Sequence, residues 1–343
     1  MLVAVSSFVL AVLLAPVVAE IGLRLFAPVA YCAPLRLQAR ERGFEGIHQV
    51  SSVPGLEYEL APGRASPAPY FHDMVIHTNS HGMRGSEVAL DKPGGVFRVA
   101  CVGDSFTFGH GVEDEETYPA QLEARLDDEG VPGRFEVLNF GVSGYSTSDE
   151  AVQISARVLP FAPDVIVLGY VFNDPEEHPD HRLHRAFHEP RLWERSHLAR
   201  RIAEQLWKRD EQRAGGYFEL LQATDGPCWP SVERGFASIA ASARSAGVPV
   251  VVAIFPLLSG TRWRFYRYEG LHRQVAALAE ANGFAVCDLL PALRKRVPES
   301  IMLGDGDTHL NPAGDGVVAA EIARCLRERF PDIFASIGAA AAR

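Results

Sequence analysis

Apolar and polar positions alternate regularly from about residue 96 onward. Short apolar runs predict five strands, at Val96–Val102, Phe135–Leu138, Asp164–Leu168, Val248–Phe255 and Phe284–Cys287. Apolar residues spaced by three or four predict helices between and after them, at Tyr118–Leu126, Ser148–Val158 with Ser148 as N-cap, 231–246, Leu271–Asn282 and Asp315–Phe330. This alternation predicts a three-layer, doubly wound α/β fold around a five-stranded parallel sheet.

Two stretches depart from this alternation. Residues 25–94 are rich in Pro, Gly and His, and their weak periodicity predicts an irregular lead-in. Residues 176–230 are too long for a simple crossover and predict a solvated, partly helical insertion, placed so that it could fold over a site as a lid. A metal cluster is the alternative for the histidines of this insertion, although no Cys or carboxylate pattern completes it: His178, His181, His184, His188 and His197.

The N-terminal segment is strongly apolar. Leu2 to Ala19 holds no charged residue, which is borderline long enough for a helix that crosses a bilayer. We expect an uncleaved membrane anchor over residues 1–24, because no Lys or Arg precedes the run to form a basic n-region. A signal peptide cut near Ala19 and a buried core helix are the alternatives. The arginines that follow would keep the C-terminal side cytoplasmic on the positive-inside rule: Arg24, Arg36, Arg40 and Arg42.

Composition narrows the class of partner and cofactor. The chain of 343 residues is 47% hydrophobic and 22% charged, an ordinary globular balance with enough length for a core that needs no metal or disulfide scaffold. A net charge of −10 argues against a duplex nucleic-acid partner. The five cysteines include no CxxC pair, so zinc and redox sites are disfavoured, and Cys101 and Cys287 are expected to be buried small hydrophobic residues.

Polar residues that suit a hydrolytic site follow the predicted strands. Gly103-Asp104-Ser105 and Asn173-Asp174 come directly after apolar strands, and Asp307-Thr308-His309 lies near the C-terminus. A parallel sheet gathers such groups at one edge. A serine hydrolase needs a nucleophile, a base, a group that orients the base, and oxyanion donors. We therefore expect Ser105 as nucleophile, although a plain Asx or Ser turn would use the same residues.

The remaining groups complete the set. A histidine can take and return the serine proton, so His309 is the expected base, with Asp307 as acceptor for its other nitrogen and Asp305 as the competing acid. A calcium-binding loop of Asp305, Asp307 and Asn311 is the alternative, but the usual glutamate is missing. Asn173 is a neutral side-chain donor, and Gly144 offers an uncrowded backbone N–H.

These residues resemble the SGNH hydrolases, also called the GDSL-like lipase/acylhydrolase superfamily, over about residues 95–330. The four matching blocks are Val102–Gly109 with Phe106 in place of leucine, Asn139–Gly144, Val167–Asp174 and Asp307–His309. The resemblance implies a flavodoxin-like fold, a hydrolase domain over 95–335 and a Ser105–His309–Asp307 triad. It also implies an oxyanion hole from Ser105, Gly144 and Asn173, and chemistry without cofactor or metal. Residues 78–85 are similar to the lead-in of membrane-tethered members.

Two departures from the family pattern matter. Three residues separate Gly169 from Asn173, so that Gly169 has no assigned role, and the acid stands two residues before His309 rather than the commoner three. The expected function is a membrane-tethered serine esterase that removes O-acyl groups, O-acetyl included, from a lipid or carbohydrate. Its location outside the cytoplasm is implied by the resemblance and not by the charges beside the N-terminal segment. Secretion after signal cleavage is the alternative location. A carbohydrate O-acetyltransferase and an inert binding or assembly protein are the alternative functions.

Overall fold

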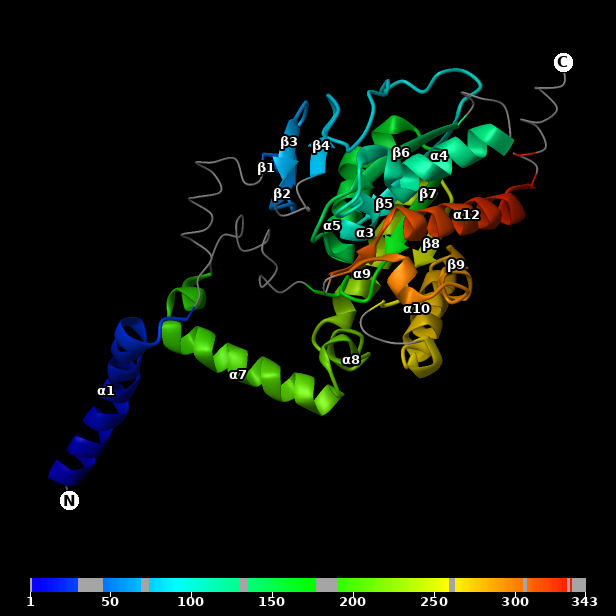
Figure 1. Ribbon diagram of the computed structural model, residues 1–343. Coiled ribbons are helices and arrows are strands. Elements are labelled where there is room, and N and C mark those ends of the chain that lie inside the picture. Colours follow the sequence, from blue (N-terminus) through cyan, green and yellow to red (C-terminus); the bar gives the residue numbers. More distant parts are fainter. Residues whose placement is uncertain are drawn as a thin grey trace, which may run out of the picture.

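A five-stranded parallel sheet lies at the centre of the computed structural model, in the order β6-β5-β7-β8-β9 (Figure 1). The structure describes residues 2–29, 46–68, 74–129, 135–176, 191–258, 263–304, 307–331 and 334, with the backbone alone for 2–9 and 11. The strands are β5 (Phe97–Gly103), β6 (Phe135–Gly141), β7 (Val165–Tyr170), β8 (Val250–Ile254) and β9 (Ala285–Asp288). The predicted doubly wound parallel sheet is confirmed.

Helices cover both faces of this sheet because its central strands are apolar on both sides. Ile166 and Leu168 of β7 enter one hydrophobic cluster, whereas Val165 and Val167 enter the other. Each such buried aliphatic side chain contributes about 1.5–3 kcal/mol relative to exposure. The first cluster packs under α5 (Thr147–Gln153), α9 (Trp229–Ala246) and α10 (Glu269–Ala281), and the second under α4 (Tyr118–Glu129) and α12 (Pro312–Arg329).

The start of α5 differs from the prediction. Its N-cap is Ser146, not Ser148: the Ser146 hydroxyl accepts the N–H of Asp149 at 3.4 Å, and the Asp149 carboxylate accepts the N–H of Ser146 at 2.9 Å. An acidic residue three positions after Ser146 makes this reciprocal capping box possible. The helix continues as a π-helical turn, η3 (Ile154–Val158), and a 3-10 turn, η4 (Leu159–Phe161).

Short elements complete the hydrolase region. They are α3 (Ser105–Phe108), η2 (Asp114–Glu116), η6 (Trp263–Phe265), α11 (Leu290–Leu293), η7 (Pro298–Ser300), β10 (Met302–Gly304) and β11 (Asp307–Leu310). β10 and β11 pair as an antiparallel hairpin directly before α12. The segment before the last helix, expected as a loop, therefore contains two short strands.

The described part of the lead-in forms two small antiparallel pairs. They are β1 (His48–Val50) with β2 (Tyr58–Leu60), and β3 (Ala65–Ala68) with β4 (Met74–His77). A separate apolar cluster joins these strands to Phe108, Val142 and Tyr145 of the hydrolase region. Strands of three or four residues are too short to give a period in the sequence, which explains why only irregular structure was expected.

Arg84 fastens the lead-in to the turn after α3. The residue is 3% exposed, and its guanidinium donates to the carbonyl oxygens of Phe108 at 2.9 Å and Val112 at 2.6 Å, and to the Asp114 carboxylate at 2.7 Å. A planar guanidinium with five donors suits such a convergent set of acceptors. The lead-in is thus packed against the elements that carry Ser105.

An arm of helices extends from the α/β domain (Figure 1). It contains α1 (Leu2–Phe26) and, from the insertion, η5 (Leu192–Arg195), α7 (His197–Ala214) and α8 (Tyr217–Leu221). Glu20 of α1 accepts the N–H groups of His197 and Leu198 at the start of α7, at 3.1 and 2.8 Å. The described insertion is partly helical, as predicted, and its role as a lid stays a prediction.

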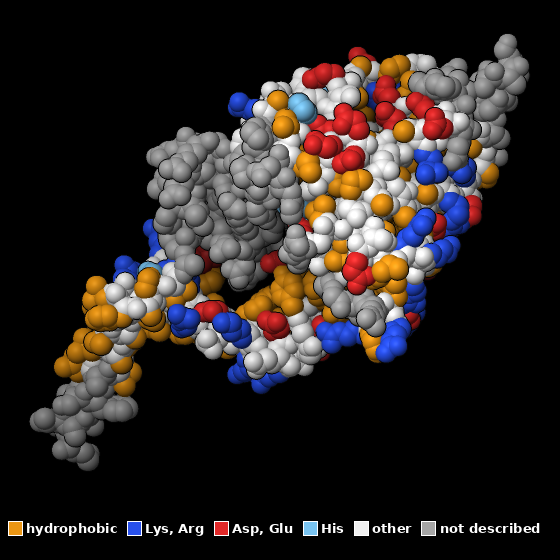
Figure 2. All heavy atoms as spheres, viewed as in Figure 1, with side chains coloured by type: hydrophobic (Ala, Val, Ile, Leu, Met, Phe, Trp, Pro, Cys, Tyr) orange, Lys and Arg blue, Asp and Glu red, His pale blue; other side chains and the backbone are white. Residues whose placement is uncertain are grey.

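The N-terminal segment is helical, but its predicted role is not supported. Among the described residues, no helix has both the length and the apolar character needed to cross a membrane. Apolar side chains nevertheless gather on the surface of α1 (Figure 2), with Leu13, Val18, Leu25 and Phe26 all exposed. In the insertion, His197 accepts the N–H of Val29 on Nδ1 at 3.0 Å, and the other four histidines lie outside the described residues.

The cysteines follow the prediction at one position and depart from it at another. Cys101 is a buried free thiol, as expected. Cys287 is buried but is not a simple hydrophobic residue, because it forms a disulfide with Cys325. The bond joins β9 to α12, with Cα atoms 6.0 Å apart. The two cysteines are 38 residues apart in the sequence, so only the packing of α12 on the sheet brings them together.

Candidate active site

Ser105 begins the short helix α3, immediately after β5. Asp104 is the N-cap, and its Oδ1 accepts the N–H of Phe106 at 2.9 Å. The other carboxylate oxygen, Oδ2, lies 3.4 Å from the Ser105 hydroxyl. Ser105 therefore stands at a helix N-terminus, where free backbone N–H groups favour negative charge. Its side chain is half-buried.

Three glycines let α3 lie directly on the sheet edge. Gly103 at the end of β5 pairs with Gly141 of β6 and Gly169 of β7. A Cβ at Gly103 or Gly169 would come within 2.2 or 2.6 Å of the Thr107 hydroxyl, and one at Gly141 within 2.1 Å of the backbone nitrogen of Phe108. Gly169, which had no assigned role, is thus required for the packing of α3.

The β10–β11 hairpin brings His309 to Ser105. The Ser105 Oγ and His309 Nε2 are 2.8 Å apart, and His309 Nδ1 is 2.6 Å from Asp307 Oδ1. The same Asp307 oxygen accepts the backbone N–H of His309 at 2.9 Å, an Asx turn that places this oxygen beside the ring. With Nδ1 protonated toward Asp307, Nε2 is free to accept the serine proton.

Neighbouring residues argue against the calcium-loop alternative. Asn311 caps α12, accepting the N–H of Gly314 at 3.0 Å, and donates to the carbonyl of Met302 at 2.9 Å. Asp307 is bonded to His309. Two of the three expected oxygen ligands are therefore engaged in holding the hairpin, and the third, Asp305, lies outside the described residues.

The predicted oxyanion donors lie at the ends of the two neighbouring strands. Asn173, half-buried after β7, has its amide nitrogen 3.4 Å from Asp104 Oδ2. Gly144 is the third residue of a turn closed by the Tyr145 N–H on the Val142 carbonyl at 3.1 Å. Its φ of +80° is that of the third position in a type II turn, which strongly favours glycine. Turn geometry alone therefore accounts for glycine at this position.

Buried carboxyls lie behind the nucleophile. Asp104, Asp174 and Glu150 are almost fully buried. Burial raises the pKa of Asp104, while the Phe106 N–H and the charge of His309 act in the opposite direction. Burial, followed by the neighbouring Asp174 carboxyl, raises the pKa of Glu150 well above its ordinary value. Burial and then Asp104 do the same for Asp174. The sequence analysis placed Asp104 and Asp174 directly after apolar strands, whereas it did not single out Glu150.

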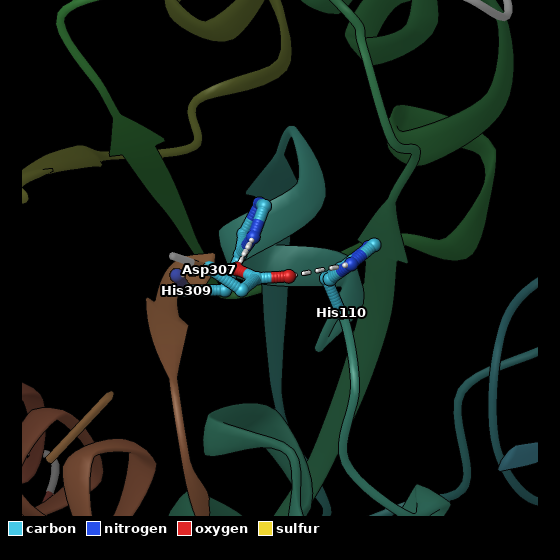
Figure 3. A group of neighbouring side chains, drawn as sticks. All are labelled: His110, Asp307 and His309. Atoms are coloured by element: carbon cyan, nitrogen blue, oxygen red, sulfur yellow. Dashed lines mark hydrogen bonds and ion pairs between the residues drawn. The ribbon is translucent and has the colours of Figure 1, made fainter. Parts of the chain in front are cut away.

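His110 is a site residue that the sequence analysis missed. It is 7% exposed, and its Nε2 lies 3.3 Å from the second oxygen of Asp307, Oδ2. Its ring stacks on His309 with centroids 4.2 Å apart (Figure 3). In the described part of the chain, donor atoms of His110, Asp307 and His309 lie within 4.8 Å of one another, close enough in distance to suit a metal ion. A histidine five residues after the serine was the available signal.

A parallel α/β sheet with a serine, a histidine and an aspartate in hydrogen-bonded sequence at its edge is an arrangement typical of serine esterases. Comparison with protein families gives the more specific class. The profile of the GDSL-like Lipase/Acylhydrolase family matches residues 101–317, so the chain belongs to this family. It is accordingly an enzyme that hydrolyses ester bonds. A search of curated proteins gives no match.

The solved structures that match this chain are distant from it in sequence. An acetylxylan esterase, Axe2 from Geobacillus stearothermophilus, is 15% identical over 67% of this chain and 94% of its own, with a TM-score of 0.43. A lipase/acylhydrolase from Enterococcus faecalis is 15% identical over 68% and 97%, with a TM-score of 0.43. The psychrotrophic esterase EstA from Pseudoalteromonas sp. is 11% identical over 68% and 98%, with a TM-score of 0.44.

Proposed function

We propose that the protein is a serine esterase that removes O-acyl groups from a lipid or carbohydrate, with Ser105 as nucleophile. The observation that carries the proposal is the unbroken chain of short contacts from Ser105 Oγ to His309 and on to Asp307, at 2.8 and 2.6 Å. Nucleophile, base and orienting acid are the parts that acyl transfer through an alcohol requires. Asp307 is the proposed acid because it faces His309.

The reaction proceeds in two steps. His309 Nε2 takes the hydroxyl proton as Ser105 Oγ attacks the ester carbonyl, and returns that proton to the departing alcohol. Water then attacks the acyl-serine, with His309 again as base, and releases the acid. The proposed donors to the oxyanion are the N–H groups of Ser105 and Gly144 and the amide of Asn173. The mechanism uses no cofactor or metal.

Aromatic side chains lie beside the proposed catalytic residues, where they would contact the acyl group of the substrate. The Phe106 ring lies 5.0 Å from the His309 ring and 5.3 Å from the Phe255 ring, measured between centroids. Aromatic faces beside the reacting atoms suit a hydrocarbon better than a charged group. The net charge of −10 also disfavours polyanionic substrates.

The test is hydrolysis of aryl esters of increasing acyl length by the wild-type protein and by Ser105→Ala and His309→Ala. Each substitution is expected to lower kcat by a factor on the order of 10⁴–10⁶ with the fold intact. Ser155→Ala, at an exposed serine outside the site, is the matched control. A serine-directed phosphonate should label the wild type and not Ser105→Ala.

Unchanged turnover in both site variants contradicts the proposal. Transfer of the acyl group to a sugar in preference to water would make the protein an acyltransferase.

We also propose that the enzyme works outside the cytoplasm and is held at a membrane surface by α1. The exposed apolar side chains of α1 support the attachment, with Phe26 86% exposed. The Cys287–Cys325 disulfide supports the location, because disulfides persist mainly in oxidising compartments.

A further inference from the structure

Two histidines share the carboxylate of Asp307. His309 is on Oδ1 at 2.6 Å, and His110 is on Oδ2 at 3.3 Å (Figure 3). The rings lie against each other with an interplanar angle of 29°. The orientation of the base by Asp307 explains the contact of His309 with Oδ1, but it does not explain the contact of His110 with Oδ2. The second contact calls for a separate explanation.

Hydrogen bonding explains the arrangement better than a metal ion does. The lone pair of an imidazole nitrogen lies in the ring plane, so the lone pairs of two stacked rings lie in two nearly parallel, separated planes, which disfavours their meeting at one ion. Here each ring meets a different oxygen of the same carboxylate. A carboxylate has acceptor sites on both oxygens and can serve both rings at once.

His110 is itself held to the turn that carries the nucleophile. Its backbone N–H donates to the carbonyl of Ser105 at 3.0 Å. The adjoining carbonyls of Phe108 and Val112 accept from the buried guanidinium of Arg84. The His110 side chain therefore reaches Asp307 from a backbone whose position is fixed relative to Ser105.

We propose that His110 is a positioning residue, which donates its Nε2–H to Asp307 Oδ2 and so prevents the carboxylate from rotating away from His309. A carboxylate bonded through one oxygen can turn about its Cβ–Cγ bond, and water can compete for the other oxygen. Asp307 is half-buried, so water can reach its surroundings. The inference rests on the proposed triad, because it assigns His110 a role only through Asp307 and His309.

Two substitutions separate the donor from the ring. His110→Phe keeps an aromatic ring that can stack on His309 but removes the donor. His110→Gln removes the ring but places an amide N–H at about the reach of Nε2. We expect His110→Phe to lower kcat for an aryl acetate by about 10- to 100-fold with KM within about twofold, as for a small misplacement of a catalytic group. His110→Gln should recover most of that loss.

Titration with the serine-directed phosphonate gives the concentration of reactive active sites, and each kcat is calculated per reactive site. Thermal unfolding shows whether each variant is folded. Equal kcat in His110→Phe and wild type, or a loss in His110→Gln as large as in His110→Phe, overturns the proposal. So does stoichiometric Zn²⁺ retained by the wild type and lost in His110→Phe, since the residue would then be a metal ligand. Ser105→Ala separates failure of the proposed triad from failure of the proposed role of His110. If Ser105→Ala keeps its activity, the triad is refuted. If Ser105→Ala is inactive but His110→Phe is unaffected, only the role of His110 is refuted.

Discussion

Glu150 is a buried carboxyl group that makes the stability of the protein depend on pH. It is 0% exposed, and neither carboxylate oxygen has a hydrogen-bond partner among the described residues. Burial raises its pKa well above the ordinary 4.5. The folded state therefore holds the proton at a pH where the unfolded chain has released it. The stability that comes from this difference is fully present below about pH 4.5 and is lost as pH rises toward the folded pKa.

Glu150→Gln should raise the free energy of unfolding at neutral pH by about 1–3 kcal/mol, because an amide is not forced to ionise or to stay protonated in the interior. The gain should shrink as pH approaches 4.5, where the unfolded carboxyl is protonated as well. Urea unfolding at pH 4.5, 6 and 8 measures both effects.

Glu115→Gln, at an exposed carboxyl, is the matched control and should leave stability nearly unchanged. A Glu150→Gln protein less stable than wild type at every pH would show that an unidentified partner satisfies the native carboxylate.

At this same scale, the sequence indicated Ser105, His309 and Asp307 because their residue types are rare in this combination at strand ends. The structure brings these three together, while their catalytic roles stay a proposal. His110 could not be found in this way. A histidine in a glycine-rich turn is common, and only the fold of the β10–β11 hairpin places it against Asp307.

Among the elements, α12 has a double attachment. Its N-terminus follows β11 directly and is capped by Asn311, and Cys325 near its C-terminus is bonded to Cys287 of β9. The helix therefore spans from the strand that bears His309 to the edge of the sheet. Loss of the disulfide at the C-terminal half of α12 should lower the stability of the protein more than its kcat, because Asn311 still caps the N-terminal half of the helix.

Reduction of the disulfide should lower the free energy of unfolding by about 2–4 kcal/mol, from the larger freedom of the unfolded chain. Thermal unfolding with and without a thiol reductant measures the change. The double variant Cys287→Ala/Cys325→Ala should show the lower stability and no further response to reductant. Cys101→Ala, at a buried free thiol, is the control whose reductant response should match that of the wild type. A wild type that does not respond to reductant would contradict the contribution of the bond.

The strands of the sheet could be predicted because apolar runs bounded by glycine or polar residues identify them, and all five were found within a few residues. The lead-in could not, because its short strands are stabilised by contacts with Phe108 and Tyr145 that lie far away in the sequence. The disulfide was missed for the same reason: it depends on which helix packs beside β9.

At the scale of the whole molecule, the arm is chemically unlike the domain. α1 exposes apolar side chains, whereas the site elements lie in the compact α/β region (Figures 1 and 2). Within the arm, α1 meets the start of α7, where Glu20 binds backbone N–H groups that the helix leaves free. These contacts lower the pKa of Glu20 to about 2, with the Leu198 N–H as the largest cause. The carboxylate stays charged across the physiological range.

If α1 holds the enzyme at a membrane, the full chain should sediment with membranes and be released by detergent. A protein lacking residues 1–26 should remain in the supernatant, with kcat for an aryl ester within about twofold of the full chain, because no site residue lies on the arm. Cell fractionation with an esterase assay measures both. Glu20→Gln in the full chain is the control: it removes the charge that binds α7 but keeps the apolar surface, so it should still sediment. Recovery of both lengths in the supernatant would contradict the attachment.

The position of Arg84 also decides where the protein can be cut. The family profile begins at residue 101, and a boundary chosen from it would discard Arg84 together with β5 residues of the central sheet. Even a cut just before β5 would leave the carbonyls of Phe108 and Val112 without their donor and would expose the apolar cluster around Tyr58. We therefore expect the smallest unit that folds as an enzyme to start no later than the first strand of the lead-in, β1. A chimaeric protein that takes its catalytic region from this chain should therefore include the lead-in from β1 onward.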